Sequence, residues 1–131
     1  MSGTKEDQVI YYVEKAGEMI NDAKLLADNA AWTSCMNRLY YACYYAVTAL
    51  LLKYGIPVKT HSGIKTQFNL HFVKAGIVSK EQGKLYAELM NWREKSDYSA
   101  FFNANAQSVG PLIQPAVELV KVIVVLIESK Q

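Results

Sequence analysis

Three residues in the segment 93–98 (REKSDY) could act together on a phosphate: Arg93, Asp97 and Tyr98. Arg93 and Asp97 are four positions apart, so they share one face if the segment is helical. A guanidinium steadied by a carboxylate beside a cleft is one way in which a protein prepares a phosphate clamp. The alternative is a surface ion pair, which contributes about a few tenths of a kcal/mol. Composition alone favours the ion pair.

A second candidate set consists of Arg38, Tyr41 and Tyr45, which are spaced by three and four residues and so fall on one side of a predicted helix. Packing of the tyrosines in a core or interface, with the arginine at its rim, is the simpler interpretation. The functional alternative is that Arg38 and Arg93 form a two-arginine pocket for a phosphate, with Tyr41 beside it.

The two histidines, His61 and His71, are candidates for a general base or acid. His61 follows Lys59 and Thr60 at the start of a predicted helix, where exposed backbone amides and the lysine could receive a phosphate. A capping or loop histidine is the alternative at position 61. His71 lies between two apolar residues, and we predict that it is partly buried and structural.

These residues must be positioned by helices, because apolar residues recur at intervals of three and four along most of the chain. The segment 31–54 is apolar on two sides, which indicates a helix with neighbours on both sides. Pro111 and Pro115 either lie near the first turns of the last helix or kink it. The predicted helices cover about residues 5–28, 31–54 and 62–74, then a segment opened by a capping box at 79–82 and ending around 97–102, and finally 105–129.

Four long helices and one short one, joined by short links, predict an all-α fold: an antiparallel four-helix bundle with an additional short helix. The 131 residues, about half of them apolar, are expected to form a single domain, 1–131. Surplus apolar and aromatic surface on the second and fourth helices indicates self-association, and a two-fold homodimer is the commonest outcome.

The net charge of +2 is too small for a strongly basic nucleic-acid scaffold, so any contact with RNA must be local. The sequence has no P-loop, no GxGxxG and no HExxH motif. It also lacks a Cys/His cluster typical of a metal site. We therefore expect neither a cofactor nor a metal.

Cys35 and Cys43 are eight residues apart on one predicted helix, about 12 Å along its axis, which is too far for a disulfide. Two buried thiols fit a reducing cytoplasm. The polar segment 1–7 lacks the features of a signal peptide. The uncharged stretch Leu39 to Leu52 is too short to span a bilayer. A cytoplasmic protein without a membrane contact is expected.

Three short sequence motifs, in a fixed order along the chain, resemble those of the HEPN family of small helical bundles. They are RLYYA at 38–42, KTHSG at 59–63 and REKSDY at 93–98. The resemblance extends over nearly the whole chain and implies a cleft shared by two subunits. In the ribonucleases of that family, an arginine is followed a few residues later by a histidine, and cleavage needs no metal. The arginine holds the phosphate while the histidine serves as base or acid.

Arg93 matches the family's arginine, whereas the positions where the histidine is expected hold Tyr98, Ser99 and Ala100. A tyrosine, with an unperturbed pKa of about 10, is a poor base near neutral pH. The pair Asp97 and Tyr98 resembles a branch of the family that keeps the arginine and loses the histidine.

The resemblance implies a dimeric nucleotide- or RNA-binding protein that acts with a separate nucleotidyltransferase partner in a toxin–antitoxin-like pair. Some such partners transfer a nucleotide to a tyrosine near the arginine motif, which makes Tyr98 a candidate acceptor. Two alternatives stay open. One is a metal-independent ribonuclease that uses Arg93 with His61 or another base, and the other is a non-catalytic binding or assembly module.

Overall fold

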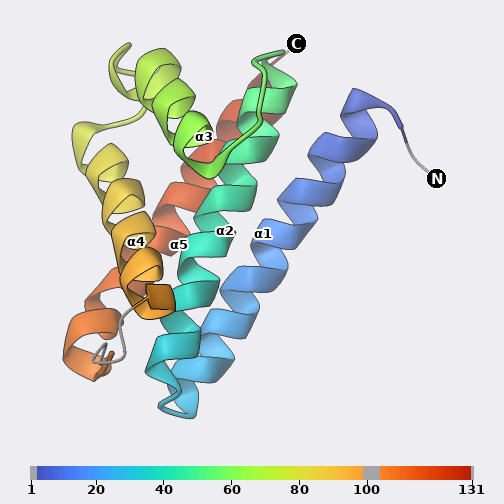
Figure 1. Cartoon of the computed structure of the whole chain (residues 1–131). Coiled ribbons are helices and arrows are strands. Elements are labelled where there is room, and N and C mark those ends of the chain that lie inside the picture. The colour runs from blue at the N-terminus through green and yellow to red at the C-terminus, as the bar shows by residue number, and fades with distance from the viewer. Residues whose placement is uncertain (1–2, 99–103, 131) are drawn as a thin grey trace.

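A computed structural model of the chain describes residues 3–98 and 104–130, and within its fourth helix it describes side chains as far as residue 95 (Figure 1). The described residues form helices and no β-strand, which confirms the predicted all-α fold. In chain order the elements are α1 (Lys5–Asp28), α2 (Trp32–Lys53), α3 (His61–Phe68), the π-helical segment η1 (Asn69–Val73), α4 (Lys80–Tyr98) and α5 (Ala106–Ser129).

Helix starts follow the capping chemistry that the sequence predicts. The Thr4 side chain accepts a hydrogen bond from the backbone N–H of Asp7 over 3.0 Å, which caps α1. The Ser79 hydroxyl likewise accepts from the N–H of Gln82 over 3.1 Å, at the start of α4. These short-range bonds satisfy amides that have no partner inside the helix, so both starts lie within one residue of the prediction.

Helix α2 is the centre of the molecule. It packs along α1 and α5 and also contacts α3 and α4. Figure 1 shows it between α1 and α4, with α5 behind it. Twelve of its 22 residues are buried. The predicted helix with neighbours on both sides is therefore confirmed, and most of α2 is committed to packing.

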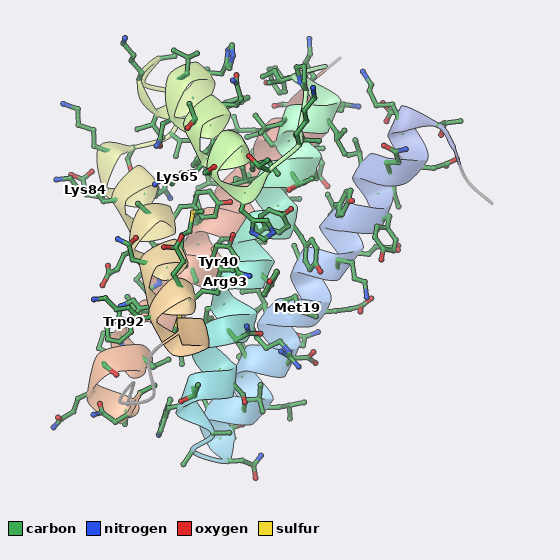
Figure 2. The ribbon with its side chains drawn as sticks, viewed as in Figure 1. Met19, Tyr40, Lys65, Lys84, Trp92 and Arg93 are labelled. Atoms are coloured by element: carbon green, nitrogen blue, oxygen red, sulfur yellow. The ribbon has the colours of Figure 1, made fainter. Side chains whose placement is uncertain are left out.

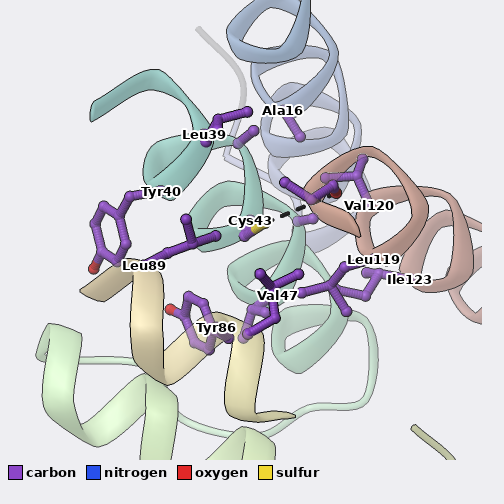
Figure 3. Packing of buried hydrophobic residues seen from close by; sticks show 14 of the residues in the cluster. Ala16, Leu39, Tyr40, Cys43, Val47, Tyr86, Leu89, Leu119, Val120 and Ile123 are labelled. Carbon is purple, nitrogen blue, oxygen red and sulfur yellow. Dashed lines mark hydrogen bonds between the residues drawn. The ribbon is translucent and has the colours of Figure 1, made fainter. Parts of the chain in front are cut away.

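The core lies where α2, α4 and α5 meet (Figure 3). Cys43 of α2 points at α5, where its sulfur lies 3.9 Å from the carbonyl oxygen of Ala116. Burial raises the pKa of the Cys43 thiol to about 12, so it remains a protonated thiol at neutral pH. Cys35 and Cys43 are both buried and free, as predicted. Large side chains that are fully buried around them are Met36, Leu39, Tyr40, Val47, Tyr86, Leu89, Leu119 and Ile123.

The third helix departs from its prediction. The single helix expected over 62–74 is α3 followed by η1, in which the N–H of Lys74 bonds to the carbonyl of Asn69, five residues back. The apolar spacing of Phe68 and Phe72 is compatible with both forms, because a π turn differs from an α turn by only one residue. Both phenylalanines are buried against the core.

Helix α5 contains Pro111 and Pro115 and is continuous through both. Both prolines are exposed, so the carbonyls that lose their helical partners face the solvent side. By length and composition alone, α5 is the one described helix long and apolar enough to cross a membrane. The core helix of a soluble protein meets the same test, and α5 buries eight residues in this fold. This helix is therefore weak evidence for a membrane.

Candidate functional site

Arg93, His61 and three tyrosines of α2 meet at one place on the molecule. Figure 2 labels Arg93 and Tyr40 at this place. The guanidinium carbon of Arg93 lies 5.7 Å from the ring centroid of Tyr40 and 5.8 Å from that of Tyr41. Aromatic faces at this range attract a cation. Arg93 is half-buried, and its Nε atom is fully enclosed by protein. The predicted site residues Arg93, Tyr41 and His61 therefore come together.

His61 is held in place by two tyrosines. Its Nδ1 atom is 2.7 Å from the Tyr40 hydroxyl, at hydrogen-bonding distance. Its ring stacks on Tyr44, with centroids 4.2 Å apart and ring planes at 10°. With Nδ1 engaged by Tyr40, the imidazole has its other nitrogen, Nε2, for a ligand. His61 is the first residue of α3, at the helix start that was predicted, and it belongs to an aromatic cluster that also contains Arg93.

The electrostatics of the cluster favour a neutral imidazole. Burial lowers the pKa of His61, and the positive charge of Arg93 lowers it further. Burial raises the pKa of Tyr40 above its usual range, with Arg93 partly opposing this effect. At neutral pH the cluster thus combines a fixed cation, a neutral imidazole and a protonated phenol. A cation can hold a phosphate, and a neutral imidazole can accept a proton.

The local sequence around His61 fixes where α3 begins. Thr60 is the N-cap residue, and its hydroxyl accepts a hydrogen bond from the N–H of Gly63 over 2.9 Å. A Cβ atom at Gly63 would lie 2.8 Å from this hydroxyl, so only glycine leaves the cap undisturbed. The amide of Gly63 is already bonded and is not available to a phosphate, which corrects part of the predicted anion site.

Lys59 directly precedes the N-cap residue Thr60. It lines a shallow cavity of about 310 Å³ with four other residues: Pro57, Thr60, Gly63 and Gln67. The lysine is exposed. Its predicted role in phosphate binding stays a prediction.

Arg38 faces helix α1. Its Nε atom lies 3.7 Å from a carboxylate oxygen of Asp22, and one of its terminal nitrogens donates to Asn37 over 2.8 Å. Arg38 and Asp22 also line a small cavity of about 200 Å³ with Leu25 and Leu26. The two-arginine pocket remains a prediction, because the contacts of Arg38 in the described chain point to α1.

Two of the predicted catalytic residues cannot be placed in the site. Helix α4 extends to Tyr98, but the side chains of Asp97 and Tyr98 lie outside the described residues. His71 is exposed, and its ring lies 3.1 Å from the side-chain oxygen of Gln67. The prediction of a partly buried His71 was therefore wrong.

Tyr40 and Tyr44 belong to the candidate site but were missed by sequence reasoning. The apolar stripe of α2 assigns Tyr40 to the core, and its side chain is indeed fully buried. The missed signal is the phenol itself, since a buried tyrosine hydroxyl usually finds a partner.

No group of three or more potential metal ligands is present among the described residues.

Comparison with known sequences decides the family. A profile of the HEPN domain matches residues 9–127. The chain belongs to the HEPN domain family. Its HEPN fold is similar to the crystal structure of TT1696 from Thermus thermophilus, with a TM-score of 0.69 and 15% identity over 95% of this chain and 98% of that one. At that identity the likeness shows the fold alone.

Two relatives illustrate the range of similar HEPN chains. A "UPF0332 protein" from Thermotoga maritima is 40% identical over 125 residues, which cover 95% of both chains. A protein of Methanocaldococcus jannaschii named "Putative toxin MJ0605" is 31% identical over 93 residues, which cover 71% of this chain and 69% of that protein.

The first prediction concerns the protonation of His61. An NMR titration of the imidazole should give a pKa below the ordinary value of 6.5. Arg93→Gln should raise this pKa, because a nearby cation disfavours a second positive charge. Stability should fall as the pH drops from about 6.5 through the folded-state pKa, because the unfolded chain then binds the proton first.

Lys121→Gln is the control for this titration, since it removes one positive charge from an exposed site on α5. It should leave the pKa of His61 unchanged. A wild-type pKa at or above 6.5, or equal effects of the two substitutions, would contradict the arrangement of Arg93 beside the imidazole.

Proposed function

We propose that this HEPN protein binds a nucleotide or RNA through Arg93, His61 and the tyrosines of α2, and that it acts as a dimer in a toxin–antitoxin-like pair. The observation that carries the proposal is the convergence of Arg93 from α4 and His61 from α3 on Tyr40 of α2. A guanidinium matches the geometry of phosphate oxygens. Half-exposed aromatic rings suit unpaired bases, which stack on their faces.

Dimerisation is proposed from the surface beside this site. The rings of Tyr12 in α1 and Tyr45 in α2 stack with centroids 5.8 Å apart, and both side chains are half-exposed. On the same helix as Tyr12, Ile10 and Tyr11 are each 54% exposed. Large exposed apolar and aromatic side chains favour a self-complementary interface. A dimer formed here would bring two copies of the Arg93 site towards a common crevice.

A separate nucleotidyltransferase is proposed as the partner, with Tyr98 as a candidate acceptor near Arg93. The names of two relatives from Methanocaldococcus jannaschii, both "Putative toxin", support a toxin-like role. The buried free thiols Cys35 and Cys43 support a cytoplasmic location, where cysteines remain reduced.

A metal-independent ribonuclease is the second candidate, because His61 lies beside Arg93 although it comes from a different helix. In this reaction His61 would take the proton from a ribose 2′-hydroxyl, and the 2′-oxygen would bond to phosphorus while the bond to the 5′-oxygen breaks. Arg93 would balance the charge on the phosphoryl oxygens. The departing 5′-oxygen would take the proton that His61 has just accepted, which restores the neutral imidazole and leaves a 2′,3′-cyclic phosphate and a 5′-hydroxyl.

The binding proposal is tested with labelled single-stranded RNA by fluorescence anisotropy. Arg93→Ala should weaken binding about tenfold or more, because a charge-assisted hydrogen bond contributes about 1.5–3 kcal/mol. Lys95→Ala is the control, as it removes an exposed cation from the same helix. Equal losses in the two variants would mean that general charge, and not the Arg93 site, determines binding.

Cleavage is tested in the presence of EDTA. Wild-type protein should cut RNA, while Arg93→Ala and His61→Gln should each lower the rate by about 100-fold, measured at a temperature at which a melting curve shows each variant to be folded. His71→Gln, which alters an exposed histidine, should retain the wild-type rate. If clean wild-type dimer leaves RNA intact, the ribonuclease candidate is eliminated and the binding proposal stands alone.

Purification of the protein from native lysate tests the assembly. Light scattering should give the mass of at least two chains, and mass spectrometry should identify a nucleotidyltransferase in the same fraction. A monomer that carries no such enzyme would refute the proposed pair.

A further inference from the structure

Charge is unevenly distributed along this chain. The segment 54–87 contains five lysines and one glutamate, a net charge of +4, whereas the segment 1–31 contains three lysines and six carboxylates, a net charge of −3. The overall value of +2 therefore conceals a basic part, made of α3, η1 and the first half of α4, and an acidic helix α1. Clustered charge of one sign attracts a partner of the opposite sign.

Ion pairs with carboxylates involve some of the described lysines and not others. Lys15, Lys53 and Lys121 each lie within 4.0 Å of a glutamate oxygen. Within residues 3–98 and 104–130, no ion pair involves the lysines of the segment 54–87, which are Lys59, Lys65, Lys74, Lys80 and Lys84. No carboxylate in the described part of the chain lies within 4.0 Å of these five lysines, as is also true of Lys24 on α1.

Three of these lysines lie along the line where α3 and η1 approach α4. His61, Lys65 and Asn69 are spaced by four residues, so they share one face of the helix over about 12 Å. At the far end Asn69 lines a cavity of about 280 Å³, together with Lys80 and Lys84 of α4. We call these five residues the α3–α4 seam. In Figure 2, Lys65 on α3 and Lys84 on α4 lie above Tyr40 and Arg93.

The cavity at the end of the seam depends on a close helix approach. A Cβ atom at Gly83 would lie only 3.0 Å from the methyl groups of Val73, so glycine lets η1 and α4 come together there. The cavity walls are mostly apolar, and its two lysines belong to one turn of α4. Glu81 and Glu88 are the carboxylates within one turn of Lys84 on α4, and with both of them counted the segment 54–88 has a net charge of +3.

We propose that the α3–α4 seam binds the backbone of a single strand of RNA that continues from the Arg93–His61 site to the cavity beside Lys80 and Lys84. Lys65 contacts a phosphate midway along this path. The inference rests on the proposed function and specifies its substrate as an oligonucleotide. A single strand fits better than a duplex, because its unpaired bases can stack on the half-exposed rings of Tyr41 and Tyr44.

The test compares oligouridines of about two and about eight nucleotides, of which only the longer lies within known single-strand site sizes. Wild-type protein should bind the longer strand more tightly. The double variant Lys65→Ala/Lys84→Ala should weaken binding of the longer strand about tenfold and lower its salt slope by about 0.7 for each lost contact, with little effect on the dinucleotide. These exposed or half-exposed lysines can be replaced without unfolding, which a melting curve verifies.

The matched control is Lys24→Ala/Lys121→Ala, which removes two lysines from α1 and α5 and should leave affinity for the longer strand nearly unchanged. Equal effects of both double variants, or affinity independent of length, overturn the seam even when Arg93→Ala abolishes binding. A failure of wild-type protein to bind either strand overturns the proposed function itself. Binding of duplex RNA as tightly as of a single strand overturns the assignment of a single-stranded substrate.

Discussion

The hydrogen bond between Tyr40 and His61 is the interaction on which the site depends. Tyr40 is fully buried at the centre of α2, and its hydroxyl reaches the Nδ1 atom of His61 at 2.7 Å. Because a buried phenol without a partner is unfavourable, this bond fixes the start of α3 against α2. It also orients the imidazole beside Arg93. The side chain of Tyr40 therefore belongs both to the packed core and to the candidate site at the surface.

The site is small and local because most of α2 is buried in the core. With α1, α4 and α5 packed around it, the part of α2 from residue 39 to residue 51 exposes only parts of Tyr41, Tyr44 and Tyr45. Arg93 and His61 reach those rings from α4 and α3. The fold thus brings together groups that are separated by 17 to 53 positions in the sequence.

The helices could be predicted from the sequence because apolar spacing and capping residues act over three or four positions. Thr4 and Ser79 each mark a helix start correctly. The π-helical turn could not be predicted, since Phe68 and Phe72 have the same spacing in either kind of helix. The exposure of His71 was missed for the related reason that apolar neighbours along the chain do not determine which face a residue occupies.

The site was predicted in part. Arg93, Tyr41 and His61 were identified from the sequence motifs that contain them, and the structure brings them together. Their connection through Tyr40 was not foreseen, because the periodicity of α2 accounts for that residue fully as core. Contacts between different helices depend on how the helices pack, and no local pattern records this. The same limit applies to Arg38, whose ion pair with Asp22 joins α2 to α1.

The π-helical turn η1 has a consequence for changes in chain length. A π turn contains one residue more than an α turn, so the segment Asn69–Val73 can lose a residue and become an ordinary α turn. Phe68 and Phe72 would then be three positions apart and would still share a face. A deletion elsewhere in α3 would instead rotate every following side chain by about 100° and remove Phe72 from the core. The turn is therefore the point at which this helix tolerates a shorter sequence.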